Sequence, residues 1–129
     1  MKKRISFSLL LTVLVISCIS LSFAEIFADD VFNNVSTTLT SSKTASFSAE
    51  TFNNQSSIKV TRVRLYRQNG NYWILIGDLP VPTDEATNTN LYGATKNYSS
   101  DIGTGTYRLL TTFTADGHSI SRYSNTKTY

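Results

Sequence analysis

Apolar and polar side chains alternate over short segments along the chain beyond residue 24. The alternation is clearest over residues 45–51 and 107–115, where every second side chain is apolar or a threonine. A period of two places one face of a β-strand against a core and the other face toward solvent. No segment beyond residue 24 has the period of an amphipathic helix, so we expect an all-β protein.

Residues 58–79 form the clearest predicted unit, a hairpin of two β-branched and aromatic runs. Asn69-Gly70 separates the runs, and both residues tolerate the positive φ angles of a two-residue type I′ turn. This turn would place Gln68 opposite Asn71. It also fixes the partners of the preceding residues, which are Arg67 with Tyr72, Tyr66 with Trp73, Leu65 with Ile74, Arg64 with Leu75, and Val63 with Ile76.

The same register assigns each side chain of this hairpin to one of two faces. The expected core face holds Val63, Leu65, Ile74 and Ile76. The expected outer face holds Arg64, Tyr66, Trp73 and Leu75. The apolar positions also change phase between Val60 and Val63, which predicts a β-bulge at Thr61-Arg62.

The other predicted elements are separated by turn residues. A second hairpin is expected over residues 105–129, reversing at Asp116-Gly117, with a three-residue loop that includes His118 as the alternative. A turn is expected at Asn53–Ser56, and Pro80–Pro82 should end the first hairpin. The sequence predicts a polar loop over Thr83–Asn90, followed by a short strand over residues 91–95.

About seven short strands in a chain of this length predict a single small antiparallel β-sandwich of the immunoglobulin or fibronectin type III kind. The stretch from Arg62 to Gly77 resembles the third-strand hairpin of fibronectin type III-like domains, and residues 105–117 with Ser124-Asn125 resemble their final hairpin. Together they also resemble a group of small exported Gram-positive bacterial proteins of unknown function. The resemblance implies a sandwich with Tyr107 in the place of the late-strand tyrosine, and it implies no catalytic residue.

The N-terminus predicts a secretory signal peptide over residues 1–24. Basic residues at positions 2–4 precede an apolar run that ends in Ser-Phe-Ala, as in an n-region, an h-region and a cleavage site. Cleavage after Ala24 is preferred, with cleavage after Ala28 as the second choice. Val-Ile-Ser before Cys18 resembles a lipobox, so a lipid anchor at Cys18 is a further alternative, disfavoured because the next residues stay apolar.

Two segments follow the predicted signal peptide. Residues 25–42 are expected to form an N-terminal segment with an edge strand, and residues 43–129 the sandwich domain. Removal of the signal would leave a secreted, extracellular protein with no membrane span.

Composition narrows the range of partners. The formal net charge is +3, and Lys2, Lys3 and Arg4 supply all of it, so the predicted mature domain is neutral. A neutral domain has no general attraction to phosphate backbones, and we expect no nucleic-acid partner. Cys18 is the only cysteine, so the mature form would have no thiol for soft metals or nucleophilic catalysis.

The residues suited to catalysis or metal binding form no recognisable site. His118 is the only histidine, and a tight turn would point Asp116 and Ser119 apart rather than into a relay with it. The Thr83–Asn90 loop offers oxygen ligands for calcium but lacks the acidic spacing and glycine of known calcium loops. The sequence therefore predicts no catalytic residue, no metal and no cofactor, hence a protein that is not an enzyme.

The most informative constellation is the predicted outer face with Arg64, Tyr66 and Trp73, which Arg62 and Lys59 extend along the same strand. Aromatic rings beside guanidinium groups stack on sugars or on aromatic groups of peptides. Cross-strand aromatic pairs also stabilise sheets that bind no ligand, which is the alternative interpretation.

These observations predict a secreted or cell-surface binding module that recognises a polysaccharide or a protein through Arg64, Tyr66 and Trp73. One alternative is a structural subunit of an extracellular matrix or coat, whose strand edges pair with other subunits. The last alternative is a small secreted hydrolase. The oligomeric state stays open.

Overall fold

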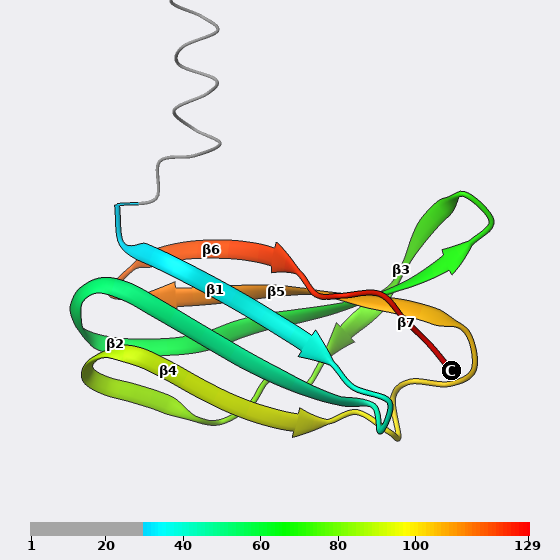
Figure 1. Cartoon of the computed structure of the whole chain (residues 1–129), viewed down its shortest axis with the longest axis horizontal. Helices are drawn as coiled ribbons and strands as arrows, with labels where there is room; N and C mark the ends of the chain where they lie inside the picture. The colour runs from blue at the N-terminus through cyan, green and yellow to red at the C-terminus, as the bar shows by residue number, and fades with distance from the viewer. Residues whose placement is uncertain (1–29) are drawn as a thin grey trace, which may run out of the picture.

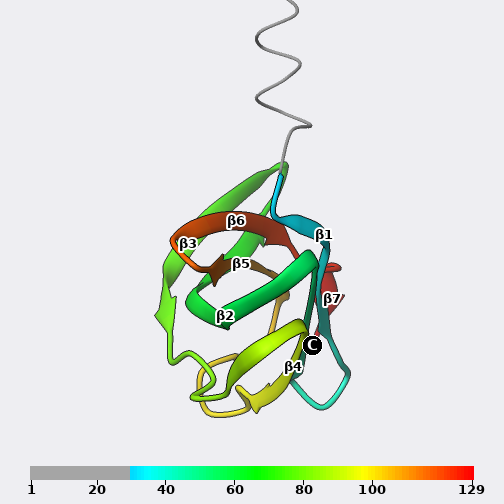
Figure 2. The same ribbon diagram turned by 90° about the vertical axis from the view of Figure 1, so that its left-hand side faces the viewer.

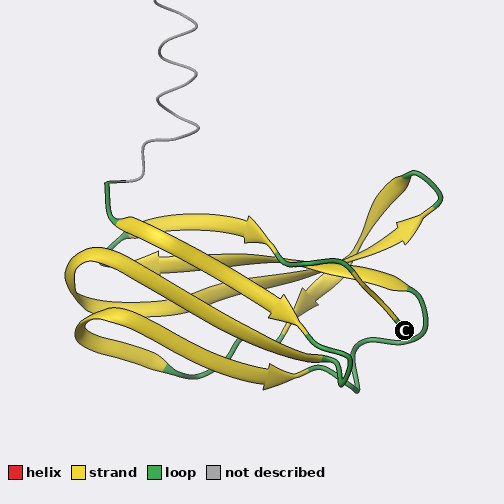
Figure 3. Ribbon diagram, viewed as in Figure 1, coloured by secondary structure: helices red, strands yellow, loops and turns green. Residues whose placement is uncertain are grey.

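The computed structural model of the protein describes residues 30–129, which contain seven β-strands and no helix (Figures 1 and 3). The strands are β1 (Phe32–Leu39), β2 (Thr44–Asn69), β3 (Tyr72–Leu79), β4 (Glu85–Asn97), β5 (Thr106–Ala115), β6 (His118–Tyr123) and β7 (Lys127–Thr128). The described part of the chain accordingly offers no helix that could cross a membrane. The predicted signal peptide, with Ala24, Ala28 and Cys18, lies outside the described residues.

All strand pairs are antiparallel and belong to one sheet. Its main path runs β1-β2-β5-β6, while β3 and β4 also pair with β2 and β7 pairs with β5. The sheet curls into a half-barrel, which is visible end-on in Figure 2. The predicted all-β antiparallel class is confirmed. The predicted sandwich of two separate sheets is not shown by this arrangement, because one hydrogen-bonded sheet runs through the bent strands.

Strand β2 shows why the sheet is continuous. The turn predicted at Asn53–Ser56 is wrong, since β2 runs without a break through these residues and bends there (Figure 1). Groups distant in sequence hold the bend: the N–H of Phe52 donates to the carbonyl of Val31 at 3.0 Å, and the backbone N–H groups of Ser56 and Ser57 donate to the Asp116 carboxylate. These backbone N–H groups at the bend are therefore hydrogen-bonded without a tight turn.

The polar loop predicted over Thr83–Asn90 is also wrong, because β4 begins at Glu85. Residues 85–89 of β4 pair with residues 55–59 of β2, and residues 91–97 pair with residues 44–50. The register shifts between these two halves, and Asn88, within the first of them, has a positive φ of 52°. Most side chains in residues 85–89 are polar on both faces, so this edge segment shows no alternation that could reveal a strand.

The β2–β3 hairpin forms with a different turn from the predicted one. Asn69 pairs with Tyr72, so the two loop residues are Gly70 and Asn71. Gly70 has φ 61° and Asn71 does not have a positive φ, which matches a type II′ turn with glycine in its first position rather than type I′. The observed partners are Gln68 with Trp73, Arg67 with Ile74, and Tyr66 with Leu75.

The predicted core face of this hairpin is half wrong. Val63 and Leu65 are buried, whereas Ile74 is 45% exposed and Ile76 is 54% exposed. A register irregularity lies between Leu65 and Tyr66, and the tip of the hairpin projects beyond the rest of the sheet (Figure 1). No other strand of residues 30–129 covers the inner side of β3 near the tip, so its isoleucines stay in contact with solvent.

The β5–β6 hairpin confirms the sequence prediction. Ala115 pairs with His118, which leaves Asp116 and Gly117 as a two-residue loop with positive φ at both positions. Every odd-numbered residue of β5 is buried. The β-bulge predicted at Thr61-Arg62 is confirmed as well, because the β2–β5 register shifts between Val60 and Arg62.

The core lies inside the curl of the sheet. Side chains of β1, β2, β4 and β5 and of the 98–102 turn fill it, among them Leu39, Phe47, Ile58, Val63, Leu65, Tyr98, Leu109 and Phe113. The Tyr98 hydroxyl donates to the carbonyl of Pro80 at 2.6 Å, which ties the core to the chain just beyond β3. The core therefore supports the base of the β2–β3 hairpin and leaves its tip free.

Candidate binding face

Four strands present one continuous outer face, opposite the core. The register places Tyr66 beside Arg108 and Arg64 beside Leu110. It also places Leu110 beside Tyr123 and Tyr66 beside Leu75. Directly paired residues of an antiparallel sheet share a face. The outer face therefore runs across β3, β2, β5 and β6.

Arg108 is the centre of this face. Its Cζ lies 4.2 Å from the centroid of the Trp73 ring and 4.0 Å from that of the Tyr123 ring. The Tyr66 ring meets the Tyr123 ring edge-on, with 5.9 Å between centroids. We call Trp73, Arg108, Tyr123 and Tyr66 the Arg108 stack. A guanidinium against an aromatic ring contributes about 0.5 to 2 kcal/mol, so these contacts help to hold the four side chains together.

Arg64 belongs to a separate group on the same face. Arg62 donates from Nε and Nη2 to the two carboxylate oxygens of Asp78, at 3.3 and 3.2 Å. Nε of Arg64 lies 3.3 Å from Oδ1 of Asp78 but is not aligned for a hydrogen bond, so this contact is electrostatic. The hydrogen bonds from Arg62 lower the pKa of Asp78, with a smaller effect of Arg64. Asp78 thus offsets one of the two positive charges of Arg62 and Arg64.

Hydroxyl groups cover the end of the outer face near the β5–β6 turn. Thr114 lies 3.0 Å from both Thr61 and Ser119 between hydroxyl oxygens, and Thr112 lies 2.8 Å from Ser121. The face therefore changes from hydroxyl groups, through the arginines with Asp78, to aromatic and apolar side chains at the β3 end.

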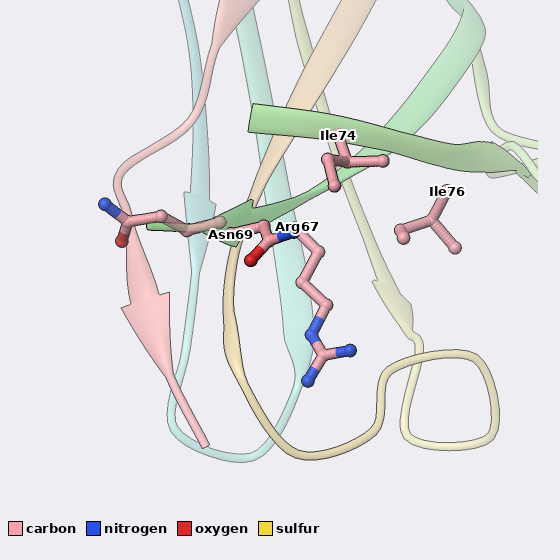
Figure 4. Close-up of a pocket in the computed structure, with 5 residues that line it drawn as sticks. Arg67, Asn69, Ile74 and Ile76 are labelled. Carbon is pink, nitrogen blue, oxygen red and sulfur yellow. The ribbon is translucent and has the colours of Figure 1, made fainter. Parts of the chain in front are cut away.

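A shallow hollow lies on the opposite side of the hairpin tip. It has a volume of about 250 Å³ and is lined by Arg67, Gln68, Asn69, Ile74 and Ile76 (Figure 4). Arg67 packs against Gly105, where an added Cβ would lie 2.8 Å from Nε of Arg67. The isoleucines predicted to be core residues thus form the wall of an open hollow.

The structure brings together two of the three predicted site residues. Tyr66 and Trp73 both join the Arg108 stack, although Trp73 pairs with Gln68 rather than with Tyr66. Arg64 instead faces Asp78. Sequence reasoning missed Arg108 and Tyr123. A signal for Tyr123 was present, because the Asp116-Gly117 turn fixes its position opposite Leu110.

The residues weighed for catalysis have other partners. Asp116 accepts hydrogen bonds from Ser56 and Ser57, which lower its pKa, and the Ser119 hydroxyl bonds to Thr114. Neither bonds to His118 in the part of the chain that the structure describes. Over residues 30–129, no three His, Cys, Asp or Glu side chains lie close enough to hold a metal ion.

No protein-family model, curated protein or solved structure gave a significant match to the chain. The resemblance to fibronectin type III-like domains and to small exported Gram-positive bacterial proteins therefore stays a prediction. The outer face must be interpreted from its own geometry.

Proposed function

We propose that this chain is a secreted, non-catalytic module that binds a protein partner through the outer face around the Arg108 stack. The observation that carries the proposal is the exposure of apolar surface at and beside the Arg108 stack: Tyr123 is 49% exposed and Leu75 is 48% exposed. Aromatic residues and arginine dominate the energetic centres of protein interfaces, because they provide large contact areas with little loss of conformational entropy.

A protein partner fits this face better than a polysaccharide. Sugars bind aromatic residues by lying on a free ring face, but the Arg108 guanidinium lies over both the Trp73 ring and the Tyr123 ring. Partly covered rings beside exposed Leu75 offer an apolar surface with a polar surround. The arginine–Asp78 group and the hydroxyl groups supply that surround, as at the rim of a protein interface.

At the level of fold, we propose that the curled sheet is a relative of the immunoglobulin-like sandwich. Tyr107 supports this interpretation: it lies near the start of β5, is buried, and donates its hydroxyl to the carbonyl of Thr104 at 3.2 Å. A late-strand tyrosine bonded to the backbone a few residues upstream is a feature of such sandwiches. The predicted signal peptide supports an extracellular location, with a lipid anchor at Cys18 as the alternative.

Binding measurements with single-residue variants test the proposal. Wild-type protein, Tyr123→Ala and Leu91→Ala are immobilised and exposed in turn to a cell-surface protein fraction and a cell-wall polysaccharide fraction. Leu91 is an exposed leucine on β4, so its variant is the matched control. We expect wild type and Leu91→Ala to bind the protein fraction alike, and Tyr123→Ala to bind it roughly tenfold or more weakly.

Two results would contradict the proposal. Binding to the polysaccharide fraction alone would favour the polysaccharide alternative. Undiminished binding by Tyr123→Ala would show that the partner contacts another surface.

A further inference from the structure

Strand β3 leaves one of its edges without a partner in the described part of the chain. It pairs only with β2, so the backbone groups on its other side, which would continue the sheet, have no strand to bond to. We call residues 72–76 of this strand the free edge. The segment reads Tyr-Trp-Ile-Leu-Ile, without a charge or a proline.

The free edge lacks the features that normally prevent strand edges from pairing. Such edges usually carry charged residues or proline, or are covered by other elements. In β3 the charge comes later, at Asp78, and Pro80 follows the strand. The edge strand β4, by contrast, carries Glu85 and Lys96. The free edge is also open on both faces, since Tyr72 is 77% exposed and Leu75, Ile74 and Ile76 are each about half exposed.

We infer that the free edge pairs antiparallel with the free edge of a second copy of this chain, with the two Ile74 residues at the symmetry axis. In this register, Tyr72 lies opposite Ile76 of the other copy, and Trp73 lies opposite Leu75. Both rows of side chains then join apolar groups to apolar groups, on the inner and on the outer face. A C2 contact requires a surface that is complementary to itself, and this segment meets that condition.

Charge supports a second copy as the occupant. The neutral free edge selects a neutral apolar strand, which its own copy provides. The nearest arginines, Arg62 and Arg64, lie on β2, on the opposite side of β3 from the free edge, and Asp78 offsets one of their two charges. Arg67 is also on β2, where it pairs with Ile74 and lies against Gly105.

The pairing has a consequence for the outer face. A symmetry axis through paired edge strands stands perpendicular to the sheet, so the outer faces of the two copies lie on the same side. The dimer would present two Arg108 stacks on one continuous surface. A partner with repeated epitopes would then bind with avidity, without any new contact within each copy. The dimerisation itself does not depend on the proposed partner binding.

Sedimentation velocity of the full-length gene product, purified in the form that the expressing cell yields, tests the inference. We expect the mass of the sedimenting species to rise from that of a monomer to that of a dimer as the protein concentration increases. Ile74→Lys places two like charges opposite each other at the axis and should weaken dimerisation roughly tenfold or more. Leu91→Lys, the same change at an exposed leucine on the charged edge strand β4, should dimerise as wild type. Circular dichroism checks that each variant is folded.

A disulfide tests the register independently. Ile74→Cys places two thiols opposite each other, at Cα separations of about 4.5 to 5.5 Å that a disulfide can span. Mild oxidation should give a covalent dimer for Ile74→Cys, but not for wild type or Leu91→Cys. All three sequences contain Cys18, so a disulfide through Cys18 would appear in the controls as well.

The outcomes separate this inference from the proposed function. Wild type that is monomeric at every concentration up to its solubility limit, or dimerisation unchanged in Ile74→Lys, would overturn the dimer. Tyr123→Ala should weaken partner binding and leave the dimer intact, because Tyr123 lies on β6. Ile74→Lys should weaken the dimer and leave the binding of a partner with a single epitope unchanged.

Discussion

The β2–β3 and β5–β6 hairpins have similar composition and opposite surroundings. Both have two-residue loops and strands rich in β-branched and aromatic residues. Strand β5 lies between β2 and β6, and its inward side chains Leu109 and Phe113 are fully buried. Strand β3 lies at an edge, and its Ile74, Leu75 and Ile76 are exposed. Apolar content therefore shows where a strand forms, but burial depends on what covers it.

The turns differ in the same way. In the β5–β6 turn, the carboxylate of Asp116 accepts hydrogen bonds from both Ser56 and Ser57, so this turn is fastened to the bend of β2. At the tip of the β2–β3 hairpin, no hydrogen bond among those of residues 30–129 joins Gly70 or Asn71 to a strand outside the hairpin. One hairpin is part of the body of the domain, and the other is available for contacts with other molecules.

The largest test of this contrast makes the same change in both hairpins. Leu109→Ala removes a buried side chain from β5 and should lower the free energy of unfolding by about 2 to 5 kcal/mol, whereas Leu75→Ala should cost less than about 1 kcal/mol. Urea unfolding at a protein concentration too low for self-association measures both. Equal losses would contradict the different coverage of the two strands.

Substitution of Gly70 by valine should have an intermediate effect. The φ of 61° at Gly70 is unfavourable for a β-branched residue, and Gly70→Val should cost about 1 to 2 kcal/mol from backbone strain alone. Gly77→Val is the control, because Gly77 has no positive φ and equally open space. Thermal unfolding of the two variants compares them. A loss as large for Gly77→Val would mean that strain at the turn is not the cause.

The smallest expected effect concerns pH. Backbone hydrogen bonds from Ser56 hold the pKa of Asp116 below its ordinary value of 3.8. A carboxyl whose pKa is lower in the folded state stabilises the protein above the ordinary value, and this contribution is lost as the pH falls through the lower folded value. Asp116→Asn should therefore lower the melting temperature slightly at neutral pH and flatten its decrease in acid.

The pH comparison has a matched control. Asp84→Asn removes an exposed carboxylate that takes part in no hydrogen bond or ion pair among those of residues 30–129. It should leave the pH profile of the melting temperature as in wild type. An Asp116→Asn profile that coincides with the wild-type profile would show that the fastening of the turn to β2 contributes nothing.

Features set by local sequence were predictable. Alternation in β5, the Asp116-Gly117 turn and the bulge at Thr61-Arg62 each depend on a few neighbouring residues. The bend in β2 was not predictable, because its hydrogen-bond acceptor Asp116 lies 60 residues away from Ser56. The turn of the first hairpin was ambiguous, since glycine lies between two asparagines and suits either of two overlapping turns.

The candidate binding face was predictable in part for the same reason. Alternation placed Tyr66 and Trp73 on the outer face correctly, but the contacts among the side chains depend on the order of strands in the sheet. Arg108 on β5 reaches Trp73 on β3 because only one strand, β2, lies between them. Strand order is a property of the whole chain, and no segment of the sequence displays it.

The long bent strand β2 has a consequence for the timing of folding. It pairs with β1, β3, β4 and β5, and β5 reaches it only after the chain of β3 and β4 has intervened. Closing such loops costs entropy before the pairing repays it, so sheets rich in distant pairs fold slowly. A chain that emerges N-terminus first cannot complete this sheet until β5 has followed. The strand that takes part in the most pairings is therefore completed late, after most of the chain has been made.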